Sequence, residues 1–249
     1  GRGGRPDDLE STLRAGGDPA AVLRGLMQEH IETVAARYRG KVDVWDVVNE
    51  PMAYGGVGLD HNVFFENLGE EYVDFSFHLA REVDPAAELV VNEQISASEY
   101  GGVSAREFLD FLRRLLDRGV PVDGVGLQGH LLTGVPDPDA LAAFLRAIAD
   151  MGLFIEVTEM DMRIGIFADA DDPLGAQADA YNLLAEIFAN VPAVRGLMLW
   201  GVGDNVSWLD HFPPFDAGAP NHPLLLDHDL EPKPAYYAFM HGLAARQPQ

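Results

Sequence analysis

Apolar, strand-like runs alternate with helical stretches along most of this chain, and this alternation limits the folds open to it. Five runs have strand character, at Val42–Asn49, Glu88–Asn92, Gly124–Leu127, Leu153–Thr158 and Gly196–Trp200. Helical patterns lie around them, at 18–40, 63–83, 104–118, 138–151, 173–190 and 232–245. Such alternation predicts an α/β fold in which parallel strands are joined by crossover helices.

Every strand-like run is followed by polar or aromatic side chains. These groups are Asn49-Glu50, Asn92-Glu93, Gln128-His130, Glu159-Asp161 and Trp200-Asp204. A doubly wound sheet places ligands mainly at one switch point, whereas a (β/α)8 barrel collects its site from the ends of many strands. The pattern therefore favours a barrel. Since about five of eight βα units are present, we expect it to be incomplete, with an unpaired edge on the first strand.

Length and composition predict one domain over residues 1–249. Hydrophobic residues make up 47% of the sequence, enough for a sizeable core, and residues 1–18 form an irregular, Gly- and Arg-rich lead-in. No apolar run reaches the roughly 18 residues that span a bilayer, and no signal peptide is visible. The chain does not begin with Met, which is compatible with a mature form or a fragment.

The formal net charge of −23 disfavours binding to nucleic acid and to anionic membranes. It is compatible with an uncharged substrate such as a neutral polysaccharide. Only two lysines occur, which fits either the codon usage of a GC-rich genome or a salt-tolerant surface. The absence of cysteine excludes disulfides, thiolate metal sites and a cysteine nucleophile.

Two glutamates are candidates for a catalytic pair. Hydrolysis of a glycosidic bond uses two carboxyl groups, one to protonate the leaving oxygen and one to attack or stabilise the anomeric carbon. Glu50 and Glu159 each end an apolar strand, and Asn49 beside the first could bind a sugar hydroxyl. A lone strand-end glutamate is more often a surface charge, but two in matched settings favour the pair.

Further polar groups surround this pair in the predicted barrel. Gln128 and His130 end another strand, and we expect His130 to hydrogen-bond Glu159 while Asp161 orients the imidazole. The alternative for an isolated histidine is a satisfied core residue. We predict no cofactor and no metal site, because clustered ligand spacing is absent and the pair Asp227-His228 alone is insufficient.

Two tryptophans follow the last strand-like run. Trp200 and Trp208 flank a polar, glycine-containing segment, so their indole faces could stack on sugar rings. Core packing is the alternative.

Several motifs together resemble glycoside hydrolase family 10, the family of retaining endo-β-1,4-xylanases. They are Trp45-Asp-Val-Val-Asn-Glu-Pro51, Gly124-Val-Gly-Leu-Gln-Gly-His-Leu131, Val157-Thr-Glu-Met-Asp161, Trp200-Gly-Val-Gly-Asp-Asn-Val-Ser-Trp208 and Leu224-Leu-Leu-Asp-His-Asp-Leu-Glu-Pro-Lys-Pro-Ala235. They occur in the family's order between about Met27 and Ala244. The resemblance covers the family's C-terminal two-thirds.

The resemblance implies a role for each matched residue. Glu50 would be the acid/base and Glu159 the nucleophile of a double displacement with retention. The substrate-binding residues would be Asn49, Gln128, His130, Trp200 and Trp208, with Asp161 supporting the histidine. It also implies xylan and xylo-oligosaccharides as substrates, a monomer when full-length, and secretion, since a polymer does not readily enter a cell.

The chain departs from the family pattern in two places. Asn92-Glu-Gln-Ile95 stands where the family has Asn-Asp-Tyr-Asn, so a tyrosine that stacks on the aglycone side is missing. The family's N-terminal third, with three strands that line the glycone subsites, is also missing. Two alternatives therefore stay open: a catalytically impaired chain that binds xylan, and a related barrel glycosidase that acts on β-glucan.

Overall fold

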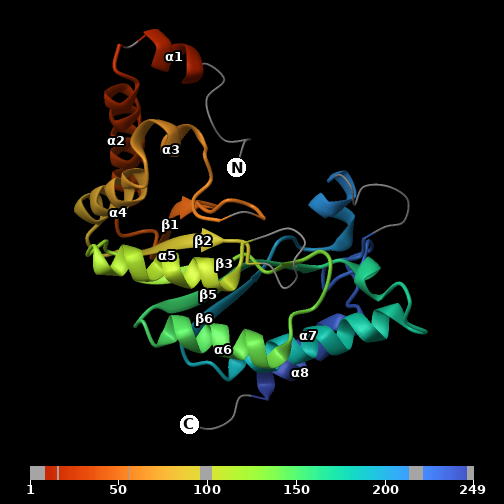
Figure 1. The fold of residues 1–249 in the computed structure, drawn as a ribbon. Helices are drawn as coiled ribbons and strands as arrows, with labels where there is room; N and C mark the ends of the chain where they lie inside the picture. The colour runs from red at the N-terminus through yellow and green to blue at the C-terminus, as the bar shows by residue number, and fades with distance from the viewer. Residues whose placement is uncertain (1–8, 16, 56, 96–102, 213–220, 246–249) are drawn as a thin grey trace. The chain divides into compact units, whose positions relative to one another are not determined.

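A computed structural model of the protein describes residues 9–15, 17–55, 57–95, 103–212 and 221–245 (Figure 1). The chain divides into two compact units. The first comprises residues 1–93 and 103–126, and the second comprises residues 94–102 and 127–249. Strand β3 (Gly124–Leu127) begins in the first unit, and its last residue belongs to the second.

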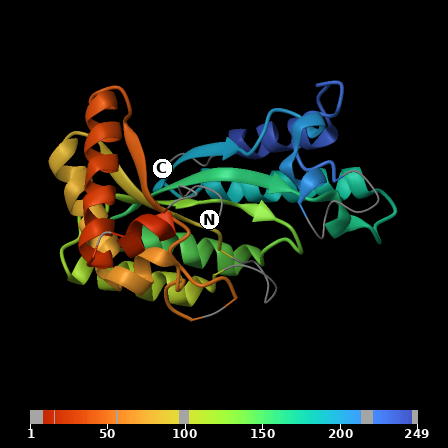
Figure 2. The same ribbon diagram turned by 90° about the horizontal axis from the view of Figure 1, so that it is seen from above.

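The first unit contains two parallel strands with helices around them. Strands β1 (Val44–Asn49) and β2 (Glu88–Glu93) pair so that Asn49 lies opposite Asn92. The helices are α1 (Leu9–Ala15), α2 (Pro19–Tyr38), α3 (Val63–Leu68), α4 (Glu71–Val83) and α5 (Ala105–Asp117). The long helix α2 packs against α4 (Figure 2). This parallel register places the ends of β1 and β2 side by side.

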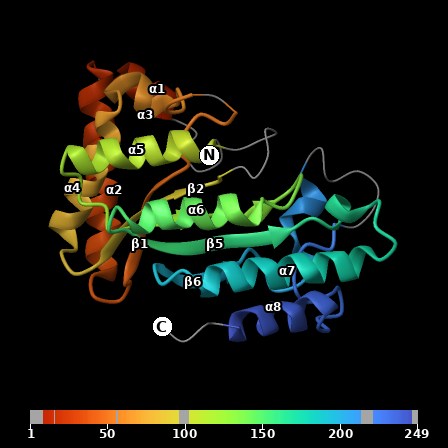
Figure 3. The same ribbon diagram turned by 60° about the horizontal axis from the view of Figure 1, so that its bottom comes forward.

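The second unit is built around a long parallel strand. Strand β5 (Phe154–Met162) pairs with the short β4 (His130–Leu131) and with β6 (Val194–Leu199). Helix α6 (Pro138–Ala149) packs against β5, and α7 (Pro173–Ala189) packs against α6 and α8 (Pro234–Ala244), with α7 and α8 side by side (Figure 3). Three short 3-10 turns follow strands β5 and β6: η1 (Ile164–Phe167), η2 (Asp204–Val206) and η3 (Trp208–His211).

Burial separates the inner strands from the outer ones. Strands β2, β3 and β5 are buried along most of their length, whereas β1 and β6 are largely half-buried or exposed, with Met198 43% exposed. Within the described residues, β1 pairs with β2 alone. The open edge predicted for the first strand is therefore present, and the five predicted strands are all found.

The structure corrects two predictions of local structure. The lead-in is not irregular at residues 9–15, because Leu9 and Leu13 lie one turn apart and are both buried, which stabilises helix α1 against α2. The helix predicted over 63–83 is two helices, since Gly69 adopts φ 62° and caps α3. Residues 1–8 lie outside the described ranges.

No helix in the described ranges is both long enough and apolar enough to cross a membrane.

Candidate active site

Glu50 occupies a constrained backbone position at the end of β1. Its φ of 53° is unusual for a residue with a side chain, and its backbone N–H donates to the carbonyl oxygen of Asn92 at 2.9 Å. The side chain of Asn92 donates to the Oδ1 of Asn49 at 3.0 Å. A Cβ atom on Gly126 would lie 2.3 Å from the side chain of Asn92, so only a glycine at position 126 leaves room for that side chain. Through these contacts, Asn92 fixes the side chain of Asn49 and the backbone of Glu50 at the strand end.

A second, buried carboxylate supports the residues after Glu50. Glu93 is fully buried, and its Oε2 accepts a hydrogen bond from the backbone N–H of Met52 at 3.0 Å. Partial burial and then the negative charges of Glu50 and Glu93 raise the pKa of Tyr54. Both glutamates therefore act electrostatically on the same tyrosine within the first unit. The sequence singled out Glu93 only as a strand-end group, without a role.

In the second unit, Glu159 belongs to a chain of hydrogen bonds centred on His130. The Nε2 of His130 lies 3.2 Å from the Oε2 of Glu159, and its Nδ1 lies 2.9 Å from the Oδ1 of Asp161. The side chains of His130 and Glu159 are 8% and 12% exposed, and Asp161 is fully buried. The contacts expected from the sequence are present, because β4 and β5 pair in parallel with His130 opposite Asp161.

The charge state of His130 follows from these contacts. Burial lowers the pKa of His130, but the hydrogen bonds to Asp161 and Glu159 and the charges of both carboxylates outweigh it and raise the pKa to about 9. At neutral pH the side chain is therefore an imidazolium that donates from both nitrogens. Such a donor hydrogen-bonds Glu159 and Asp161 at the same time.

This raised pKa predicts how stability depends on pH. The folded protein retains a proton on His130 up to about pH 9, whereas an unfolded histidine loses it near pH 6.5. The stabilisation is complete below about pH 6.5 and is lost as pH rises to 9, so the free energy of unfolding should fall by up to about 1.4 kcal/mol per pH unit. Chemical denaturation at several pH values between 6 and 10 measures this fall. A His130→Gln variant with the same dependence on pH would show that other groups cause it.

The two tryptophans of the site differ in exposure. The Nε1 of Trp208 donates to the Oδ2 of Asp161 at 2.7 Å, and its ring centroid lies 5.0 Å from that of His130. Trp200 is 49% exposed and meets the His130 ring edge-on at 6.3 Å. Trp200 therefore offers an open indole face, whereas Trp208 is partly buried and held by its indole nitrogen.

Two glutamines flank the histidine. Gln128 is buried, and its backbone carbonyl accepts a hydrogen bond from the N–H of Glu159 at 2.8 Å. Gln94 donates to the carbonyl of His130 at 2.8 Å and accepts from its N–H at 3.2 Å. Sequence reasoning saw Gln94 only as a replacement for the family's tyrosine. Its position directly after the strand-end pair Asn92-Glu93 was the one signal of this role.

Replacing Gln94 should loosen His130. Gln94→Met keeps a similar volume but leaves the N–H and carbonyl of His130 without this partner, at a cost of about 1–3 kcal/mol for each group that stays buried. We expect lower thermal stability and slower turnover. Gln28→Met is the matched control, because Gln28 is exposed and its side chain donates to Glu32 on its own helix. If both variants behaved like the wild type, the hydrogen bonds of Gln94 would have no bearing on the site.

Within the described ranges, one group of side chains is spaced to share a metal ion: Asp204, His222 and His228. None of them was predicted to contact the substrate. His130, Glu159 and Asp161 do not form such a group.

Parallel strands followed by helices, with carboxylate and amide groups at strand ends of the first unit and carboxylate and imidazole groups at strand ends of the second, define a protein of the β/α-barrel class. Within that class, the chain belongs to glycosyl hydrolase family 10, whose sequence profile matches residues 9–242. The barrel-type fold predicted from the sequence is thereby confirmed.

Relatives in this family are similar over most of the chain. The endo-1,4-beta-xylanase of Geobacillus stearothermophilus is 32% identical over 226 residues, covering 87% of this chain and 67% of that protein. Endo-1,4-beta-xylanase B of Thermotoga neapolitana is 32% identical over 220 residues, covering 87% and 60%. This chain thus spans between 60% and 67% of the length of these two relatives.

Solved xylanase structures are also similar to this chain over most of its length. Xylanase 10B of Thermotoga petrophila, in complex with xylobiose, superposes with a TM-score of 0.79 at 32% identity, covering 90% of this chain and 66% of that one. Native xylanase 10B of Thermotoga maritima superposes with a TM-score of 0.76, covering 97% of this chain and 69% of that one.

Glu50 belongs to the first unit and Glu159 to the second. For a retaining enzyme, the carboxyl groups of these two residues are expected roughly 5–5.5 Å apart, and this distance stays a prediction.

Proposed function

We propose that this chain carries the two catalytic carboxyl groups of an endo-β-1,4-xylanase, which hydrolyses internal bonds of xylan with retention of configuration. The observation that carries the proposal is the hydrogen-bonded chain of Glu159, His130, Asp161 and Trp208. It supplies a positively charged donor to one carboxylate, which is what a nucleophile that must be ionised at neutral pH requires. The endo-xylanase names of the relatives support the same substrate class.

In the first step, an oxygen of the Glu159 carboxylate attacks the anomeric carbon. The bond from that carbon to the glycosidic oxygen breaks, and Glu50 transfers its proton to the departing oxygen. The product is an ester between Glu159 and the sugar. His130 donates to the Oε2 of Glu159 in the free protein, so it also holds the carboxylate in one rotamer before the attack.

In the second step, Glu50 acts as a base. It removes a proton from water, whose oxygen attacks the anomeric carbon from the face that the leaving group vacated. The ester bond breaks, Glu159 is released as a carboxylate, and Glu50 again carries a proton. Asn49 precedes Glu50 in the chain and accepts a hydrogen bond from the side chain of Asn92, and it is proposed to hydrogen-bond the sugar.

Trp200 and Trp208 are proposed to bind the sugar rings. The half-exposed indole of Trp200 offers a flat apolar face, and Trp208 borders the histidine. Gln128 is proposed to bind the sugar at the cleavage point. We further propose that the protein acts outside the cell, because its substrate is a polymer. A monomer when full-length is also proposed, on the resemblance to the family alone.

A reducing-sugar assay on soluble xylan tests the proposed activity. Release of new reducing ends from xylan, together with faster cleavage of xylo- than of matched gluco-oligosaccharides, is the expected result. Preference for the gluco-oligosaccharides would favour a β-glucan hydrolase. Binding to xylan without cleavage would favour a catalytically impaired chain.

A further inference from the structure

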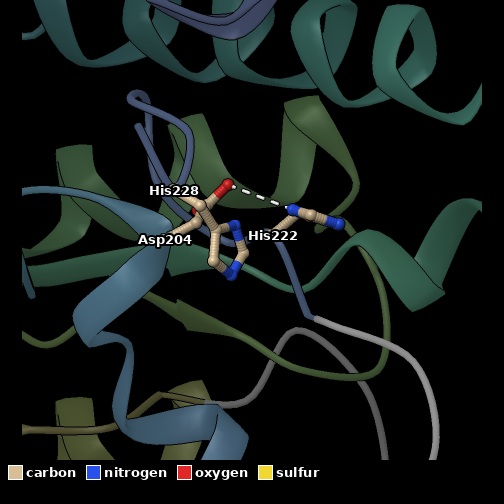
Figure 4. Close-up of side chains that lie close together, drawn as sticks. All are labelled: Asp204, His222 and His228. Carbon is tan, nitrogen blue, oxygen red and sulfur yellow. Dashed lines mark hydrogen bonds and ion pairs between the residues drawn. The ribbon is translucent and has the colours of Figure 1, made fainter. Parts of the chain in front are cut away.

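Three potential metal ligands gather in the second unit, and none of them is among the residues assigned to the substrate. Asp204 begins η2, and His222 and His228 lie in the segment before α8 (Figure 4). Each offers one ligand atom, and these atoms all lie within 4.8 Å of one another. Asp204 is fully buried, His222 is half-buried and His228 is exposed. Asp204 is therefore the buried ligand of the group, and the side formed by His228 is open to solvent.

The separation of two of these atoms already suits a metal ion. The Nδ1 of His222 lies 3.3 Å from the Oδ2 of Asp204. In a tetrahedral zinc site with bonds of 2.0–2.2 Å, neighbouring ligand atoms lie roughly 3.3–3.6 Å apart. The ring of His228 lies edge-on to that of His222, with centroids 5.3 Å apart. Because His228 is exposed, a rotation of its side chain can bring a nitrogen to the third position.

The carboxylate of Asp204 also accepts hydrogen bonds from groups outside the three ligands. The Oδ1 of Asp204 accepts from the N–H of Leu224 at 2.8 Å, and the Oδ2 accepts from the Nζ of Lys233 at 2.9 Å. An ionised carboxylate has about four lone-pair positions, so these two bonds leave room for a cation. Lys233 also donates to the carbonyl of His222 at 2.7 Å, which fixes both ligands to one side chain. Such outer hydrogen bonds are typical around metal ligands.

The ammonium group of Lys233 also sets a limit on affinity. A positive charge 2.9 Å from a ligand oxygen repels a divalent cation. Asp227 interacts electrostatically with the same lysine and partly offsets this repulsion. We therefore expect binding weaker than in a structural zinc site with four protein ligands.

We propose that Asp204, His222 and His228 bind one zinc ion, with water as the fourth ligand. Two imidazoles and one carboxylate suit zinc, whereas calcium and magnesium prefer oxygen ligands alone. Asp204 lies in the loop between Trp200 and Trp208, so the ion would join this loop to the segment that carries His222 and His228. The expected consequence is a more stable second unit.

The test compares two ligand variants with one control in untagged protein. His222 has a φ of 42°, and asparagine tolerates this conformation, so His222→Asn removes the imidazole without straining the backbone. His228→Asn alters an exposed side chain. His78→Asn is the control, because His78 is an exposed histidine on α4, outside the group. Melting in EDTA verifies that each variant is as stable as the wild type without metal.

Zinc chloride is then titrated by calorimetry, and thermal unfolding is followed with zinc and with EDTA. We expect one zinc per chain for the wild type and for His78→Asn, with a melting temperature raised by roughly 5 °C at saturating metal. Binding should be lost in His222→Asn and weakened at least about tenfold in His228→Asn, in line with the loss of one ligand. Absence of zinc binding in the wild type, or equal binding in all four proteins, would overturn the proposal.

Discussion

Replacing Glu159 with alanine should abolish turnover on every glycoside substrate. Without this carboxylate no covalent intermediate forms, and the quality of the leaving group cannot compensate. His130 would also lose one of its two acceptors, so we expect lower stability in the same variant. Hydrolysis of xylan and of an activated aryl xyloside measures the first effect, and thermal unfolding measures the second.

Glu50→Ala should behave differently, because it removes the proton donor and leaves the nucleophile in place. Xylan hydrolysis should fall by roughly 10²–10⁴-fold, the usual contribution of general acid–base catalysis. Xylosides with a good leaving group need no protonation, so they should still react and accumulate the glycosyl-enzyme. Added azide should then restore turnover and give a xylosyl azide of retained configuration.

One control and one contrary result complete this experiment. Glu82→Ala removes an exposed glutamate of α4, outside the site, and should leave both activities unchanged. If azide instead rescued the Glu159 variant with retention and left the Glu50 variant inactive, the two roles would have to be exchanged.

The second large effect is expected at Asp161. This fully buried carboxylate accepts from both the imidazolium of His130 and the indole of Trp208. Asp161→Asn removes its charge and leaves a buried positive charge with one carboxylate partner, for which a loss of roughly 3–5 kcal/mol in the free energy of unfolding is expected. Weaker hydrogen bonding to Trp208 should add a loss of catalytic rate.

The pH dependence distinguishes this effect from simple loss of packing. Since the hydrogen bond to Asp161 is the largest contribution that raises the pKa of His130, the fall in stability between pH 6.5 and 9 should shrink in Asp161→Asn. Asp150→Asn alters an exposed residue at the end of α6 and is the matched control. A variant with wild-type stability and an unchanged pH profile would contradict the assigned support of His130 by Asp161.

Apolar runs predicted the strands: β2, β3 and β5 are buried along most of their length, and β1 and β6 carry apolar runs although they are largely half-buried or exposed. Periodicity did not predict the break between α3 and α4 at Gly69 or the helix at residues 9–15. The break depends on the positive φ of one glycine, and the helix depends on the burial of two leucines, and both are set by local packing. The polar groups at the strand ends were visible as residue types with their spacing. Their partners were predicted only where motif and strand order coincided, as for His130, Glu159 and Asp161.

The sequence by itself determined the family, the two carboxyl candidates and the alternation of strand and helix, because these depend on residue order alone. Only the tertiary structure decided the other contacts between groups that are distant in the sequence. Gln94 reaches the backbone of His130, Glu93 holds Met52, and Asp204 gathers Lys233 and two histidines. The reason is physical: hydrogen bonds and shared ligands depend on distances of about 3 Å, and the chain sets such distances only when its strands have paired and its loops have packed.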